Sequence, residues 1–139
     1  MRAALASYFD DTLNFCFNSV LETMGTAVRE VISARLESRG IPAAEVPGRF
    51  DDVVKILHES FGGSARVLVY KTLVELHQQY SMRVDFTYQD SFKEHLALLR
   101  ERVLNDHLVP RRVQRDDREL DRRMQIVVHD NSPRTFSFR

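Results

Sequence analysis

Residues 65–80 read ARVLVYKTLVELHQQY and carry apolar side chains on two stripes at helical spacing. The first stripe consists of Ala65, Leu68, Val69, Leu73, Leu76 and Tyr80, and the second of Val67, Tyr70 and Val74. A helix that is apolar on nearly all sides is typical of the buried centre of a helical protein. The β-branched run near its start is also compatible with a strand, but the length of the segment and Ser64, a good N-cap, favour a helix.

Four further amphipathic segments are expected to pack around this central helix. Gly25, Gly40 and Gly62 end the helices that precede them, because glycine readily adopts the left-handed conformation of a helix end. Ser91 and Glu94 match a capping box at the start of the last helix. The expected helices span about residues 7–23, 27–38, 50–60 and 92–108. In the second of them, the residues predicted to face the core are Val28, Val31, Ile32 and Leu36.

Two regions of the chain have the pattern of β-structure. Apolar and polar side chains alternate over residues 82–88, as in a half-buried strand. Residues 124–128 and 135–138 read as two short strands joined by a turn, and a hairpin by itself is only marginally stable in water. The hairpin is therefore expected to pair either with the strand at 82–88 or with another chain. The predicted fold is mainly α: a compact bundle of about five helices with a small C-terminal β-hairpin.

The charges of the chain divide it into two parts. The 139 residues hold 20 basic and 20 acidic side chains, so the formal net charge is zero. Residues 1–109 hold 12 basic and 15 acidic side chains, whereas residues 110–139 hold 8 and 5. A mildly acidic body is thus balanced by a basic, Arg-rich end. We interpret 1–109 as a helical bundle domain and 110–139 as a charged extension that carries the hairpin.

The cellular setting follows from what the sequence lacks. A single cysteine, Cys16, excludes an intrachain disulfide and the disulfide-rich secreted class. Two aspartates, Asp10 and Asp11, fall where the apolar region of a secretory signal would continue. No uncharged run approaches the roughly 18 apolar residues of a membrane span. We expect a cytoplasmic protein without membrane association.

No set of residues typical of an enzyme stands out. The five histidines form no metal-binding pair at helical spacing, and Cys16 falls within an apolar stripe. His77 and His95 are interpreted as hydrogen-bonded residues at the edge of the core. The turn at Gly62-Gly63-Ser64 lacks the lysine that follows the glycines of a phosphate-binding loop. We therefore predict a non-enzymatic protein with no catalytic, cofactor-binding or metal site and no small-molecule substrate.

The C-terminal extension is the predicted contact region for partners. Its Arg side chains are suited to anionic partners, and its apolar side chains need a surface to cover them. The residues expected to bind a partner are Arg111, Arg112, Arg115, Arg122, Arg123, Ile126, Val128, Phe136 and Phe138. The leading hypothesis is a protein-interaction or regulatory module that docks or self-associates through the hairpin. The alternative is an RNA- or ribosome-associated protein, although interleaved acidic residues favour a solvated face over a nucleic-acid arm.

Three short segments are similar to those of a known family. They are LETMG at residues 21–25, the Ile41-Pro42 loop, and FGGSA at residues 61–65. Over about residues 10–104 the chain resembles the small helical archaeal signal-output domain family of the Nitrosopumilus output domain type. In that family the long apolar helix ends in a Leu-Tyr pair, and here Leu76-His77 stands in its place. The resemblance implies a helical signal-output or interaction module with no catalytic residues, and residues 110–139 fall outside it.

Overall fold

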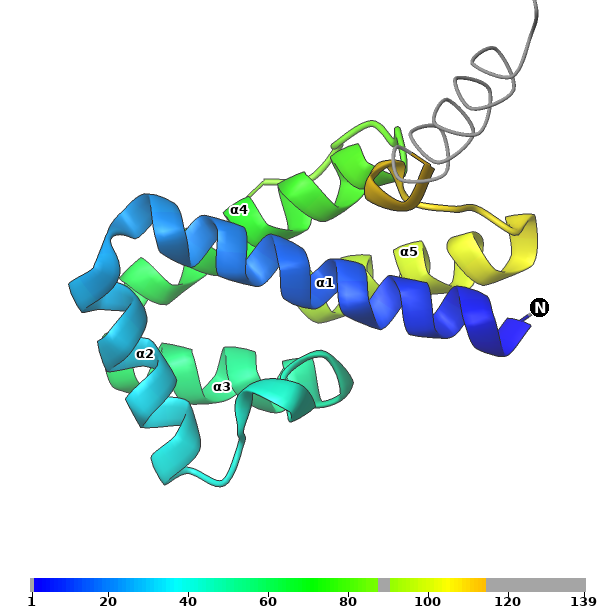
Figure 1. The fold of residues 1–139 in the computed structure, drawn as a ribbon. Helices are drawn as coiled ribbons and strands as arrows, with labels where there is room; N and C mark the ends of the chain where they lie inside the picture. Colours follow the sequence, from blue (N-terminus) through cyan, green and yellow to red (C-terminus); the bar gives the residue numbers. More distant parts are fainter. Residues whose placement is uncertain (1, 88–90, 115–139) are drawn as a thin grey trace, which may run out of the picture.

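The long helix α1 (Arg2–Met24) and the helix α4 (Gly63–Gln79) form the centre of the computed structural model, which describes residues 2–87 and 91–114 (Figure 1). They run antiparallel, since Phe9 stacks on Tyr80 near one end while Met24 and Ala65 line one groove at the other. The remaining elements around this pair are α2 (Thr26–Ser38), η1 (Ala43–Glu45), η2 (Pro47–Arg49), α3 (Phe50–Phe61) and α5 (Phe92–Asp106). The expected helical bundle is confirmed for the described residues.

The first apolar stripe of α4 is buried, as the sequence predicts. All six of its members belong to one core cluster that α1, α3 and α5 complete. The second stripe is covered less evenly, because Val67 keeps 41% of its surface exposed while Tyr70 and Val74 are half-buried. α4 is therefore the central helix of the bundle, with one open edge near its start.

The prediction that all four apolar residues of α2 face the core is wrong for two of them. Ile32 and Leu36 are buried, but Val28 and Val31 are 40% and 55% exposed. α2 lies across the end of the molecule, where the α1–α2 turn directs it away from the long axis of α1 (Figure 1). Because neighbouring elements cover only one edge of α2, half of its apolar stripe stays open to solvent.

The strand predicted over residues 82–88 is also wrong, as far as residues 82–87 show. In the described part of the chain, no residue belongs to a β-strand. The alternation itself is real, since Phe86 is buried and Met82 and Val84 are half-buried, while the residues between them are exposed. Phe86 contacts the rings of Tyr70, His77 and His95, at centroid distances of 5.7, 5.0 and 4.6 Å.

Residues 82–87 form no strand because of the elements that lie next to them. Alternation indicates an extended chain with one covered side, whatever covers it. Here α4 and α5 cover it, and helices offer no free backbone groups for a ladder because their own hydrogen bonds use them. The hairpin predicted over residues 124–138 lies outside the described residues.

Of the two N-caps predicted from the sequence, Ser91 at the start of α5 is observed and Ser64 at the start of α4 is not. Ser91 is the N-cap of α5, and its side chain accepts a hydrogen bond from the backbone N–H of Glu94 at 3.5 Å, as predicted. Ser64 does not cap α4, because the helix already begins at Gly63 and Gly62 stands at the N-cap without a side-chain bond. Gly62 has φ 63° and ψ −136°, which lets the chain turn from α3 directly into α4.

We expect Gly62→Ala to lower the free energy of unfolding by about 1–3 kcal/mol, because a side chain strains this backbone conformation. The matched control is Gly63→Ala, at the first position of α4, where alanine stabilises a helix relative to glycine. A Cβ at either position meets no atom within 4 Å, so the two variants differ in backbone conformation and not in packing. Urea denaturation of both variants measures the difference, and equal stabilities would contradict it.

Candidate functional site

Residues 110–114 pack back onto the bundle beside α1 and α4. Pro110 is buried, and residues 111–114 are helical. The backbone N–H of Arg112 donates to Oε1 of Gln79 at 2.9 Å, and its Nε donates to Oγ1 of Thr12 at 3.0 Å. Nε of Arg111 donates to Oγ of Ser81 at 3.1 Å. Both arginines are therefore engaged in contacts within the chain.

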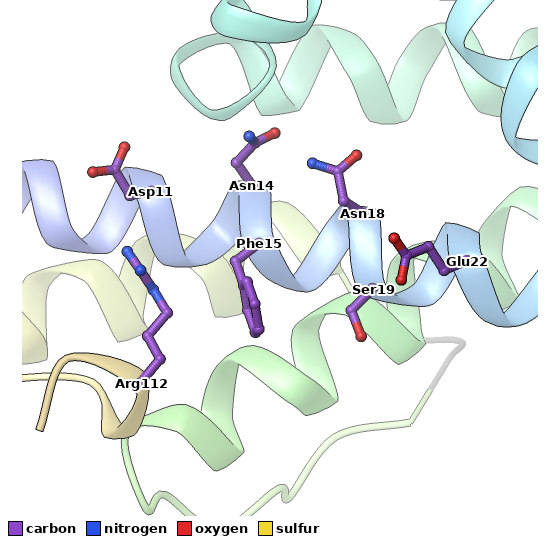
Figure 2. Close-up of a pocket in the computed structure, with 7 residues that line it drawn as sticks. All are labelled: Asp11, Asn14, Phe15, Asn18, Ser19, Glu22 and Arg112. Atoms are coloured by element: carbon purple, nitrogen blue, oxygen red, sulfur yellow. The ribbon is translucent and has the colours of Figure 1, made fainter. Parts of the chain in front are cut away.

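A polar hollow of about 490 Å³ lies along the outer face of α1 (Figure 2). Six of the residues that line it come from α1, and Arg112 reaches it from the segment that follows α5. The full lining is Asp11, Asn14, Phe15, Asn18, Ser19, Glu22 and Arg112. The guanidinium of Arg112 lies 5.8 Å from the centre of the Phe15 ring. The hollow can thus exchange hydrogen bonds with a polar surface.

Two charged side chains of this hollow already interact with neighbouring residues of the chain. Glu22 forms an ion pair with Arg29 at 3.6 Å, and Arg112 is held by Thr12 and Phe15. The lining contains no histidine and no cysteine. Nothing in its geometry brings a nucleophile and a base into hydrogen-bond contact, as nucleophilic catalysis requires.

A second hollow, the apolar groove, lies between α2 and the start of α4. Its volume is about 530 Å³, and Ser64 carries the one polar side chain in its lining. The residues that line it are Met24, Ala27, Val28, Val31, Ile32, Phe61, Ser64, Ala65 and Leu68. Val28 and Val31 form its exposed wall, whereas Ile32, Ala65 and Leu68 are buried in its floor. A concave apolar surface of this kind is typical of a binding site.

Two glycine turns create the apolar groove. Gly25, with φ 102°, joins α1 to α2, and Gly62 joins α3 to α4. Both turns lie at the same end of the bundle, since Met24 and Phe61, their neighbours in sequence, line the same groove. Because each turn directs its second helix sharply away from the first, the helices diverge at this end and leave the groove between them.

Two of the nine residues predicted to bind a partner are described by the structure, and both form hydrogen bonds within the chain. Arg111 and Arg112 hydrogen-bond to Ser81, Gln79 and Thr12, as above. The other seven lie outside the described residues: Arg115, Arg122, Arg123, Ile126, Val128, Phe136 and Phe138. Partner binding through this set, and the boundary at residue 110, stay predictions.

Sequence reasoning missed the apolar groove. Its signal was present in the apolar residues Val28 and Val31, but they were interpreted as core. Periodicity shows that a helix has an apolar face and does not show whether another element covers that face. The groove becomes visible only once the position of α2 is known.

The reactive side chains of the core lie away from both hollows. His77 is buried, and its Nδ1 lies 2.7 Å from the carbonyl oxygen of Leu73, which confirms the interpretation of a hydrogen-bonded core histidine. Burial lowers the pKa of His77 below its ordinary value. Cys16 is fully buried between α1 and α4. Among the described residues, no three His, Cys, Asp or Glu side chains cluster in a way that could hold a metal ion.

Comparisons with known proteins add no relative. No family model, no curated protein and no solved structure matches the chain. None of the helices in residues 2–87 and 91–114 has the length and the apolar composition that crossing a membrane requires.

Proposed function

We propose that the chain is a non-enzymatic protein-interaction module, of the regulatory or signal-output kind, and that its apolar groove is the docking surface. The observation that carries this proposal is the exposure of Val28 and Val31 beside a hollow with almost wholly apolar walls. Removing apolar surface from water is favourable by about 25 cal/mol for each Å². A partner that covers this wall therefore gains binding free energy from it.

The groove replaces the C-terminal extension as the centre of the proposal. The hairpin of residues 124–138 stays a proposed second docking element, but it lies outside the described residues. RNA binding through the Arg-rich extension gains no support from Arg111 and Arg112, because protein groups already accept hydrogen bonds from their side chains. A steep fall of RNA affinity with salt would be needed to revive that alternative.

Val31→Asp tests the proposed function. A carboxylate in the wall of the groove would have to lose its water when a partner covers it, so we expect affinity for that partner to fall at least about tenfold. The partner is first recovered by cross-linking to the full chain in native cells, and the binary affinity is then measured with purified proteins. The fold should be retained, since Val31 is 55% exposed.

Ser33→Asp is the matched control, because Ser33 is an exposed residue on a different face of the same helix. It should bind like the wild type and melt at the same temperature as Val31→Asp. The proposed function is wrong if no recovered protein distinguishes Val31→Asp from Ser33→Asp in the purified assay.

A further inference from the structure

The chemistry of the apolar groove limits what can occupy it. Ser64 is the one lining residue with a polar side chain, so an extended peptide would bury backbone N–H and C=O groups without partners. Addition of a strand needs an exposed sheet edge, and the described residues contain no strand. A helix satisfies its own backbone groups and presents only side chains, so it suits this surface best.

The dimensions of the groove agree with a helical occupant. On α2 the lining runs from Ala27 to Ile32 and on α4 from Ser64 to Leu68, while Met24 and Phe61 precede the two glycine turns. Four to five residues of helix rise about 6–8 Å, which is a little more than one turn. A partner helix with apolar residues at positions i and i+4 would place two anchors over this length.

Two cations lie on the helix faces that form the walls. Arg35 follows Val31 by four residues on α2, and Lys71 follows Leu68 by three on α4, so each shares the face of the groove residue before it. Both are exposed, and neither belongs to the ion pairs of the described residues. Arg35 and Lys71 do not line the groove itself; each stands about one helical turn beyond a lining residue, and together they add two positive charges to its rim.

The acidic residues nearby leave this rim with a net positive charge. Glu30 follows Ala27 by three residues and so lies at one edge of the groove face of α2, whereas Glu37 lies on another face and Glu22 is paired with Arg29. Glu75 lies one turn beyond Lys71 but is half-buried, and its charge acts on Cys16. An occupant with carboxylates beside its apolar stripe would meet Arg35 and Lys71.

A second copy of this chain is a poorer occupant. α1, α3, α4 and α5 already bury their main apolar faces in the bundle, and α2 leaves Val28 and Val31 open. Outside the groove, the exposed large apolar side chains are Tyr8 and Phe15 on α1, Val67 on α4 and Leu98 on α5, and none of these helices exposes a pair of anchors at i and i+4. A helix of a second copy could thus place two such anchors in the groove only by leaving its own core. Contact between the exposed walls of two copies would bring the like charges of both Arg35 side chains into one interface.

We propose that the apolar groove binds an amphipathic helix of a partner protein, whose apolar stripe is flanked by aspartate and glutamate. This inference rests on the proposed function, because it names the chemistry of the partner that the interaction module would recognise.

The test uses the full chain and three fluorescent peptides of about 15 residues, long enough for four helical turns. The first has leucines at i, i+4, i+7 and i+11 with flanking glutamates, the second has lysines in place of the glutamates, and the third is a scrambled acidic peptide. Fluorescence anisotropy gives each affinity at low and at high salt. We expect the acidic helix to bind about tenfold more tightly than the basic one at low salt, with a smaller ratio at high salt.

Variants of the chain test whether Arg35 and Lys71 cause the charge preference and whether the helix binds in the groove. The double variant Arg35→Glu, Lys71→Glu should prefer the basic helix, Val31→Asp should lose both helices, and Ser33→Asp should bind like the wild type. Equal affinity for the acidic and basic helices, or equal affinity for the scrambled peptide, would overturn the proposal. Light scattering that shows a dimer sensitive to Val31→Asp would overturn it too, since a second copy would then fill the groove.

The two proposals fail in different ways. If a recovered partner depends on Val31 while the model helices show no preference by charge, the interaction module stands and the acidic helix is wrong. If neither a partner nor a model helix depends on Val31, the proposed function itself is wrong.

Discussion

Leu73→Ala should lower the free energy of unfolding by about 3–5 kcal/mol, because it removes the centre of the helical core. Leu73 is fully buried in the middle of α4, the helix that packs on α1, α3 and α5. Alanine would leave a cavity that three neighbouring helices cannot all move to fill. Urea denaturation of the wild type and the variant, monitored by circular dichroism, measures the loss.

Val67→Ala is the matched control on the same helix. Val67 is 41% exposed, so its truncation should cost less than about 1 kcal/mol. The contrast separates burial from helix propensity, since both changes introduce alanine into α4. Comparable losses for the two variants would mean that α4 is not the centre of the core.

Cys16 should be almost inert toward thiol reagents in the native protein. Burial raises the pKa of Cys16 to about 12, from an ordinary value of 9.0, and the charge of Glu75 adds to the increase. At pH 8 the thiolate, which is the reactive form, would be about a thousandfold scarcer than in an exposed cysteine. Its side chain is also fully buried, so the reagent reaches it only when the bundle opens.

A labelling experiment with a coloured disulfide reagent checks this expectation. Ser7→Cys adds an exposed thiol on the same helix and supplies the fast reference rate. Leu73→Ala should speed up the labelling of Cys16 by about two to four powers of ten, because global opening follows the loss of stability. Labelling of native Cys16 at the rate of the Ser7→Cys thiol would contradict its burial.

The proposed role of the groove connects the fold to the suggested signal-output class. An output module needs a stable body and a surface that recognises a partner, and here the exposed wall of the proposed surface lies on α2, while its floor belongs to the core. α1 and α4 supply about half of the buried apolar residues, whereas α2 contributes two buried residues and the exposed wall. Variants in that wall should therefore change binding with little effect on stability.

The amino-acid sequence was sufficient to predict the helices and the buried stripe of α4. Residue spacing showed which side of α4 is buried, and Ser91 with Glu94 marked the start of α5. These features depend on neighbours within one or two helical turns, so a single sequence contains the information. The same local reasoning recognised that alternate side chains of residues 82–87 are covered, although it was wrong in predicting a strand.

What covers each apolar face could not be predicted from the sequence, because it depends on how the helices pack. Phe86 packs against rings of α4 and α5 where a sheet partner was expected, and Val31 is exposed where core was expected. Arg112, predicted to bind a partner, hydrogen-bonds to Thr12, a hundred residues earlier in the chain. Such outcomes depend on how the helices pack against one another, and therefore on contacts between residues far apart in the sequence.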